Sequence, residues 1–186
     1  KGQIDFIGIG AEKAATTWIA KILDKHPQIS ISQPKELEFF NEKRSYIFER
    51  DNPNFSKSKR WYLKHFNDNK IRGEFSTQYL HDNKAPERIK EFFPDTKIIL
   101  CLRDPVKRAY SQYLMYRDYF GKEKRNFLEV INNENEYIDK GLYYKHINRY
   151  LKYFDKKDMH IIFMEDIIKR PREVIKDLYK FLGAKE

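Results

Sequence analysis

Cysteines and metal-binding patterns are nearly missing from this sequence of 186 residues. Its single cysteine, Cys101, lies in the apolar run KIILCLR, so an internal disulfide and a cysteine metal site are both excluded. The five histidines are scattered, and no two of them stand at the spacing of metal ligands. We therefore expect a buried core thiol at Cys101 and no bound metal.

Long hydrophobic runs are also missing. No apolar stretch approaches the roughly 18–20 residues that cross a bilayer, and no charged segment followed by an apolar one marks a leader. The composition, 40% hydrophobic and 16% aromatic, is typical of a folded chain rather than a disordered one. The length indicates one domain over residues 1–186, and we expect no transmembrane segment.

Negative charge is in the minority. The 37 lysines and arginines outnumber the 28 acidic residues, which gives a formal net charge of +9. Such a charge favours an acidic partner: nucleic acid, an anionic polysaccharide, a nucleotide or a membrane surface. The excess is spread along the chain, so a solvated lysine-rich surface explains it equally well. No nucleic-acid reader motif is present, and we expect no nucleic-acid partner.

Short apolar runs alternate with helical patterns along the chain. Four runs rich in Ile, Phe or Leu predict buried strands: Ile4–Ile9, Lys70–Ser76, Lys97–Arg103 and Met159–Met164. The other periodic segments predict helices: Thr16–Lys25, Lys57–Phe66, Pro86–Phe93, Pro105–Phe120, Tyr143–Phe154 and Pro171–Leu182. This alternation predicts an α/β fold, a parallel sheet with helices on both faces. Ligands of such a fold bind where the strands end and the helices begin.

The first junction between strand and helix is GIGAEKAATT at residues 8–17. Its two glycines allow tight turns, and its two alanines let the main chain approach a ligand. Its two threonines open a helix, where free N–H groups and the helix dipole attract anions. Lys13 adds one positive charge. The junction therefore predicts an anion cradle, and the alternative is a plain turn whose lysine points to solvent.

Two common nucleotide motifs do not fit this junction. A P-loop needs the order G-x-x-x-x-G-K-[ST], whereas Lys13 is neither preceded by glycine nor followed directly by Ser or Thr. The hydroxyl that would hold Mg²⁺ is therefore misplaced, which disfavours a GTPase, an ATPase or a small-molecule kinase. The dinucleotide pattern G-x-G-x-x-G also fails, because its third glycine is replaced by Lys13.

The second junction is LRDPVKRAYSQYLMY at residues 102–116. Arg103 stands at a predicted strand end, and its planar guanidinium suits a bidentate phosphate contact. Ser111, two turns into the following helix, could return a hydroxyl to the same anion. An ion pair between Arg103 and Asp104 is the alternative for this junction taken alone.

Together the two junctions resemble the nucleotide motifs of the sulfotransferases that use 3′-phosphoadenosine-5′-phosphosulfate (PAPS). IGAEKAATTW is similar to their 5′-phosphosulfate loop, and LRDPVKRAYSQY, with its step from Arg103 to Ser111, is similar to their 3′-phosphate motif. Later segments resemble the glycosaminoglycan-type and bacterial branch in the right order: HPQISISQPKELEFF, GEFSTQYL, APERI, GLYYKHINRYL and PREVIKDLYKFLG. The resemblance covers nearly the whole chain and implies a P-loop-like α/β fold.

The resemblance also implies a donor site for PAPS and its product, adenosine 3′,5′-bisphosphate (PAP). The 5′-phosphosulfate would be held by the N–H groups and hydroxyls of Ala14, Ala15, Thr16 and Thr17. Lys13 would neutralise the bridging oxygen as the sulfuryl group leaves, and Arg103 and Ser111 would bind the 3′-phosphate. Trp18 matches a tryptophan that stacks on adenine in some members, with a core tryptophan as the alternative.

The same resemblance points to acidic residues for catalysis. In ELEFF it places the general base at Glu36. Glu38 is the second candidate, because two steps along an extended chain lie on the same face. Glu74 in the GE pair and His146 are candidates for contact with the acceptor, and for His146 a structural role is the alternative. A solvated acidic loop is the alternative for both Glu36 and Glu38.

Two departures from the family pattern affect the expected function. Phe75 stands where glycan-type members often carry a lysine, which points to a different acceptor. The sequence ends at Glu186, before the family's glycine- and lysine-rich loop, which predicts a chain truncated at its C-terminus or a domain without that loop. Both departures keep open a non-catalytic domain that binds nucleotide or anionic glycan.

The expected function is metal-independent transfer of a sulfuryl group from PAPS to a hydroxyl or amine. The acceptor would be a carbohydrate or a small molecule, and the aromatic residues Tyr62, Tyr79, Tyr143 and Tyr144 would suit stacking on sugars or phenols. Composition and the lack of cysteine pairs favour the cytoplasm. A lumenal Golgi-type domain separated from its anchor is the alternative.

Overall fold

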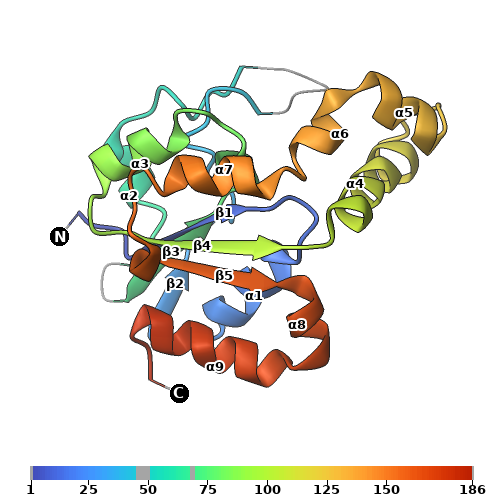
Figure 1. The fold of residues 1–186 in the computed structure, drawn as a ribbon. Coiled ribbons are helices and arrows are strands. Elements are labelled where there is room, and N and C mark those ends of the chain that lie inside the picture. Colours follow the sequence, from blue (N-terminus) through green and yellow to red (C-terminus); the bar gives the residue numbers. More distant parts are fainter. Residues whose placement is uncertain (1, 45–50, 68–69, 186) are drawn as a thin grey trace.

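A computed structural model describes residues 2–44, 51–67 and 70–185 of the chain. It contains one five-stranded sheet in which every recorded pairing is parallel, with the order β2-β3-β1-β4-β5 (Figure 1). The strands are β1 (Phe6–Gly10), β2 (Ile29–Ile31), β3 (Ile71–Phe75), β4 (Lys97–Leu102) and β5 (Met159–Phe163). The predicted parallel sheet is confirmed, with β1 at its centre between β3 and β4.

Helices cover both faces of this sheet, as predicted. The longer helices are α1 (Thr16–Asp24), α3 (Ala85–Phe92), α4 (Pro105–Leu114), α7 (Tyr143–Tyr150) and α9 (Pro171–Leu182). The shorter elements are α2 (Lys59–Leu63), α5 (Phe127–Asn133), α6 (Asn135–Asp139), α8 (Met164–Lys169), the 3₁₀ turns η1 (Thr77–Leu80) and η3 (Lys156–Asp158), and the π turn η2 (Met115–Tyr119). Figure 1 shows α1 and α9 on one face and α3 and α7 on the other.

The central strands are buried because their residues are apolar on both faces of the sheet. Glycines allow the closest approaches between them. A Cβ built on Gly8 would lie 1.9 Å from Cδ1 of Phe75, and a Cβ on Gly73 would lie 2.3 Å from Cε2 of Phe6. Phe75 is therefore a core residue that packs across β1, edge-on to Phe6.

The segment from α4 to α6 forms a lobe beside the sheet (Figure 1). It has a hydrophobic cluster of its own, made of Ala109, Tyr113, Tyr116, Val130 and Tyr137. A capping box starts α5, because the Asn126 side chain accepts from the Glu129 N–H while the Glu129 carboxylate accepts from the Asn126 N–H. The helix predicted to run to Phe120 instead changes to the π turn η2 at Met115.

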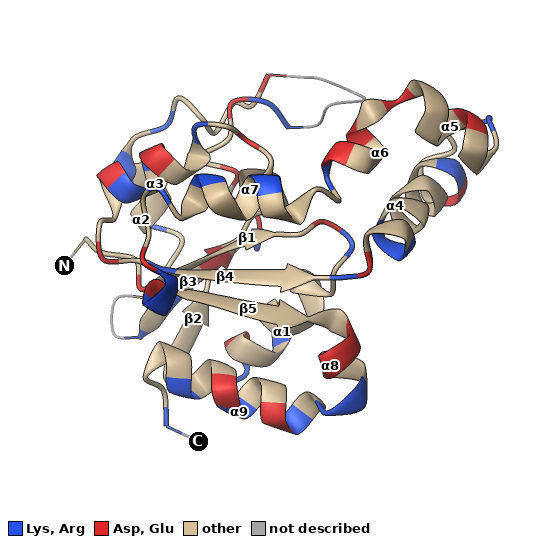
Figure 2. Cartoon of the chain, in the orientation of Figure 1, with Lys and Arg blue, Asp and Glu red and all other residues tan. Residues whose placement is uncertain are grey.

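Acidic and basic residues are interleaved along the ribbon, for example in α9 (Figure 2). The positive excess is therefore not gathered on one element of the described chain. Within that part of the chain, no helix has the length and apolar character needed to cross a lipid bilayer.

Candidate active site

The loop between β1 and α1 has the backbone shape of an anion cradle. Lys13 and Ala15 adopt left-handed conformations, with φ of 67° and 63°. Ala15 occupies the N-cap position of α1 and has no side chain that could cap the helix. Within the described residues, the N–H groups of Thr16 and Thr17 have no protein acceptor. An anion placed there would receive these hydrogen bonds and the favourable end of the helix dipole.

A cavity of about 430 Å³ opens against this loop. Most of its lining residues follow the carboxyl ends of β1, β2 and β3, and one belongs to η2: Glu12, Lys13, Ala14, Ala15, Thr16, Thr17, Glu36, Thr77, Gln78 and Met115. Lys13 and Glu36, the two predicted catalytic residues, thus meet in one cavity. The cavity lies at the carboxyl edge of the parallel sheet, where the α/β topology places ligands.

Glu36 is held at the cavity wall by polar contacts on both carboxylate oxygens. Its Oε2 accepts hydrogen bonds from the Thr77 N–H at 3.3 Å and the Thr77 hydroxyl at 3.2 Å. Its Oε1 is 2.7 Å from Nζ of Lys35. One third of the side chain remains exposed, so the carboxylate is both oriented and accessible.

Lys35 is a site residue that the sequence reasoning missed. Its ammonium pairs with Glu36 and also donates a hydrogen bond to Oγ1 of Thr17 at 3.3 Å. It therefore bridges the candidate base and the start of α1. The only sequence signal is its position next to Glu36, and a lysine beside a glutamate is too common to indicate a site.

Lys13 belongs to the loop, and Arg103 contacts the loop from the end of β4. Nζ of Lys13 lies 3.6 Å from Sδ of Met115, the first residue of η2. Arg103 follows β4, and its guanidinium donates to the Lys13 carbonyl oxygen at 3.2 Å. Ser111 lies half-buried on α4 and is not among the residues that line the cavity. The structure thus brings Arg103 to the anion loop, whereas no hydrogen bond recorded among the described residues joins the Ser111 side chain to it.

Trp18 lines a second, mainly apolar cavity of about 360 Å³ between α1 and α9. The other lining residues are Ile22, Pro171, Arg172, Ile175, Lys176 and Tyr179. The indole is half-buried at this cavity rather than enclosed in the sheet core, so an open aromatic surface is available beside the start of α1.

Glu38, the second candidate for the base, does not line the loop cavity. Its φ is 50°, so the chain is not extended here and the expected alternation of faces fails. Its carboxylate pairs instead with Nε of Arg44 at 3.0 Å, and its N–H donates to Oγ of Ser76. The prediction that Glu38 shares a face with Glu36 is therefore wrong.

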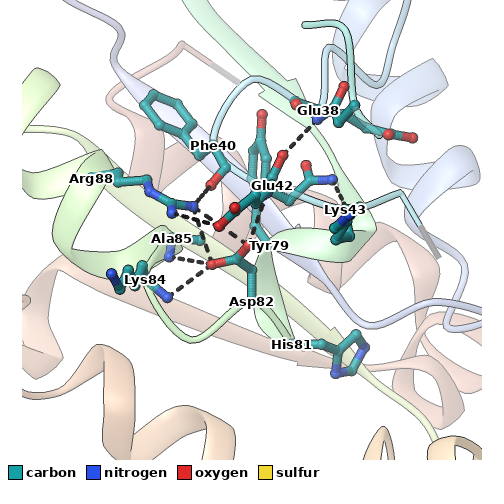
Figure 3. A network of polar contacts seen from close by, with 12 residues as sticks. Glu38, Phe40, Glu42, Lys43, Tyr79, His81, Asp82, Lys84, Ala85 and Arg88 are labelled. Atoms are coloured by element: carbon teal, nitrogen blue, oxygen red, sulfur yellow. Dashed lines mark hydrogen bonds and ion pairs between the residues drawn. The ribbon is translucent and has the colours of Figure 1, made fainter. Parts of the chain in front are cut away.

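A polar network fixes the backbone beyond Glu38 (Figure 3). Asp82 accepts hydrogen bonds from the N–H groups of Glu42, Lys84 and Ala85. Arg88 of α3 donates to the Phe40 carbonyl oxygen at 2.8 Å and pairs with Asp82. These contacts attach the segment after Glu38 to α3, and so they limit how far the Glu36 segment can move.

Glu74, which was predicted to contact the acceptor, does not line the loop cavity. It is fully buried, and Oε1 accepts the hydroxyls of Tyr62 and Tyr79, both at 2.7 Å. Oε2 accepts the Ser76 hydroxyl at 2.8 Å and the Leu37 N–H at 3.0 Å. Burial raises the pKa of Glu74 to about 6, and these hydrogen bonds limit the rise.

Two tyrosines that were predicted to stack on an acceptor are core residues. Tyr62 and Tyr79 are fully buried, and their hydroxyls donate to Glu74. Tyr143 is half-buried, and its hydroxyl donates to the Arg103 carbonyl oxygen at 2.8 Å. Only Tyr144 of the four, 83% exposed, presents its ring to solvent.

His146 lies in the protein interior, as its alternative structural role predicts. The ring is completely buried in α7, 5.0 Å from the His81 ring, and Nε2 lies 2.8 Å from the Asp139 carbonyl oxygen. Burial lowers the pKa of His146, which favours the neutral ring. It does not line the loop cavity, and its contact with the acceptor stays a prediction.

No group of three or more His, Cys, Asp or Glu side chains that could hold a metal ion occurs among the described residues. Cys101 is buried, as expected, and burial raises the pKa of its thiol to about 12. The titratable groups that line the loop cavity are therefore two carboxylates, Glu12 and Glu36, and one ammonium, Lys13.

Comparison with known proteins identifies the family of this chain. The family model for the sulfotransferase domain matches residues 3–186. A mouse bifunctional heparan sulfate N-deacetylase/N-sulfotransferase is 31% identical over 202 aligned residues, which cover 96% of this chain and 22% of that protein. The chain thus spans less than a quarter of the length of this relative.

Two solved structures show the same fold. A sulfotransferase from Alicyclobacillus acidocaldarius superposes with a TM-score of 0.86 at 28% identity, covering 98% of this chain and 82% of that one. A mouse sulfotransferase complexed with PAP has a TM-score of 0.68 at 21% identity, covering all of this chain and 60% of that one. With the family match over nearly the whole sequence, the chain belongs to the sulfotransferase domain family.

Proposed function

We propose that this chain transfers a sulfuryl group from PAPS to a hydroxyl or amine of an acceptor, with Glu36 as the general base. The observation that carries the proposal is the loop cavity, in which the uncapped start of α1, Lys13 and Glu36 face one space. An anion site and a base on one cavity are the two components that in-line group transfer needs.

The residues at the loop fit the 5′-phosphosulfate of the donor. Thr16 and Thr17 offer N–H groups that have no acceptor among the described residues, and left-handed Lys13 and Ala15 turn the loop around the anion. Lys13 would meet the charge that builds on the oxygen between phosphate and sulfate. When bound, PAPS supplies an activated sulfuryl group whose leaving group is PAP.

The rest of the nucleotide would extend over the neighbouring elements. Arg103, already in contact with the anion loop, would bind the 3′-phosphate, with the Ser111 hydroxyl as a further donor. The cavity between α1 and α9 would receive the adenine against the Trp18 indole. Its apolar lining suits a flat aromatic base.

Glu36 would take the proton of the attacking hydroxyl or amine. The N–H and hydroxyl of Thr77 hold Oε2 of Glu36, and the ammonium of Lys35 pairs with Oε1. These contacts orient the carboxylate toward the acceptor. Lys35 would add positive charge between the base and Thr17, where the transferring group carries negative charge. No metal ion enters this proposal, and transfer should proceed in the presence of EDTA.

The acceptor we propose is a carbohydrate or a small molecule with a nucleophilic hydroxyl or amine. The similar relatives are sulfotransferases named for heparan sulfate, a carbohydrate. The ammonium of Lys35 lies beside the proposed base and would favour an anionic acceptor. The buried Phe75 offers no charge at the position where a lysine was expected.

The first test is a calorimetric titration with PAP, with 5′-AMP and ATP as matched ligands. Wild-type chain should bind PAP with micromolar affinity and bind 5′-AMP about tenfold or more weakly, because one charged phosphate contact is lost. Arg103→Ala should remove this preference for the 3′-phosphate, while Arg117→Ala, on an exposed ion pair with Asp118, should retain it. Equal affinity for PAP and 5′-AMP would contradict the donor site.

A further inference from the structure

A largely buried carboxylate lies beside the proposed anion site, where its negative charge would repel the donor. Glu12 lines the loop cavity beside Lys13, in the segment that would surround the 5′-phosphosulfate. Its side chain is only 13% exposed, so water screens its charge poorly. A negative charge at this place weakens anion binding unless something neutralises it.

Lys140 supplies that neutralisation from a distant part of the chain. It is the C-cap residue of α6, its side chain is 1% exposed, and Nζ lies 2.6 Å from Oε2 of Glu12. The same ammonium lies 2.5 Å from Oε1 of Glu136, one turn earlier on the helix. Burial alone would raise the pKa of Glu12, but the charge and hydrogen bond of Lys140 outweigh burial and hold this pKa below its usual value.

A second buried cation balances the group. Arg108 of α4 is fully buried and donates to the Gln112 side chain at 2.8 Å and to the Tyr137 carbonyl oxygen at 2.7 Å. Its charge also favours the ionised form of Glu12. The two carboxylates and two cations therefore form a neutral, buried cluster between the anion loop and the α4–α6 lobe.

We propose that Lys140 is a positioning residue for the donor that acts through Glu12: it neutralises this carboxylate, so that its charge does not repel the anion bound by the 12–17 loop. This inference rests on the proposed function, because it assigns the anion of that loop to the 5′-group of PAPS. It explains why a fully buried lysine lies at the junction of α6 and α7, far in sequence from the loop that it contacts.

The test compares two lysine variants and two ligands. Lys140→Met leaves Glu12 without this partner, whereas Lys145→Met removes an exposed lysine that pairs with Asp139. Lys140→Met should weaken PAP binding by about tenfold or more, and Lys145→Met by less than about twofold. Adenosine 3′-phosphate lacks the 5′-phosphate, so its affinity should change by less than about twofold in either variant.

A rescue variant separates charge neutralisation from simple damage to the fold. The double variant Glu12→Gln/Lys140→Met removes the carboxylate together with its partner, and its PAP affinity should return to within about threefold of wild type. Glu12→Gln alone keeps the pair between Lys140 and Glu136, so it tests the idea even if Lys140→Met fails to fold. It should bind PAP at least as tightly as wild type.

Each outcome is decisive for the inference. Weaker PAP binding by Glu12→Gln, no recovery in the double variant, or an equal loss for PAP and adenosine 3′-phosphate would overturn it. Equal PAP affinity in Lys140→Met and wild type would overturn it while leaving the donor site standing. No PAP binding by wild type would instead overturn the proposed function, and the inference with it.

Discussion

Two glutamates that contact neighbouring segments of the chain have opposite surroundings. Glu36 keeps a third of its side chain exposed and accepts from Thr77 and Lys35 at the wall of the loop cavity. Glu74 is fully buried among tyrosines and accepts four hydrogen bonds. A base must exchange protons with a ligand, so access rather than pKa alone decides which glutamate can act.

The buried glutamate still serves the site. Glu74 accepts hydrogen bonds from the Leu37 N–H and the Ser76 hydroxyl. Leu37 follows Glu36 in the chain, and Ser76 precedes η1 and also accepts from the Glu38 N–H, so Glu74 helps to attach the Glu36 segment to η1. The proposed base is thus held in place by a second carboxylate that does not line the loop cavity. The contrast predicts that one glutamate controls the rate and the other controls stability.

Removing the base should have the largest effect. Glu36→Gln keeps the size of the side chain but eliminates its ability to take a proton, so kcat should fall by about 10²–10⁴-fold. PAP affinity should stay within about threefold of wild type, since the anion loop is untouched. Steady-state kinetics with PAPS and calorimetry with PAP measure the two quantities. An unchanged kcat would assign the base elsewhere.

Replacing Glu74 should instead change how the free energy of unfolding depends on pH. Its pKa is raised to about 6 in the folded chain from an ordinary value of 4.5, so the folded state holds the proton more tightly than the unfolded state. Wild type therefore loses about 2 kcal/mol of unfolding free energy, relative to Glu74→Gln, as pH rises from below 4.5 to neutrality.

Urea unfolding at several pH values checks this sign. The stability difference between Glu74→Gln and wild type should shift in favour of the variant as pH rises. A difference that is flat with pH, or that moves in favour of wild type, would show that Glu74 does not titrate as described.

Lys35 sharpens the comparison on the side of the cavity. Lys35→Met removes the ammonium between Glu36 and Thr17, and kcat should fall by about tenfold because charge on the transferring group loses a nearby cation. Lys43→Met provides a matched control, since that lysine pairs with the exposed Asp51. If both variants lose the same activity, the effect belongs to overall charge and not to the site.

Glu38 should give the smallest effect. Its carboxylate pairs with Arg44 and does not line the loop cavity, so Glu38→Gln should leave kcat within about twofold of wild type. Stopped-time assays beside Glu36→Gln compare the two directly. A loss in Glu38→Gln as large as that in Glu36→Gln would reverse the assignment of the base.

The sequence predicted the strands whose apolar runs are long and unambiguous. Strands β1, β3, β4 and β5 match their predicted runs to within two residues at each end. The residues of β1 and β4 are buried on both faces, which leaves a continuous apolar signal. Strand β5 lies at the edge of the sheet with Ile161 and Phe163 exposed, so the prediction that it is buried is wrong. Strand β2 was missed, since Ile29–Ile31 is three residues long with a serine at its centre. Pairing with β3, rather than local propensity, makes it a strand.

The parts of the candidate site that are contiguous in sequence could be predicted, and the contacts between distant residues could not. The anion loop was predictable, because its small residues and single lysine are contiguous at one junction. The burial of Glu74 was not, since its donors come from Leu37, Tyr62, Ser76 and Tyr79. The pairing of Lys140 with Glu12 joins residues 128 positions apart, and no local pattern marks it.

The most direct test of the central claim is transfer of label from sulfur-labelled PAPS by the wild-type chain, in EDTA, to a panel of heparan-type glycans, simple amino sugars and phenols. The account predicts labelled product from at least one acceptor class, with PAP formed in equal amount, and loss of that product in Glu36→Gln. PAP binding without labelled product from any class would contradict it and identify a domain that binds the donor without transferring its sulfuryl group.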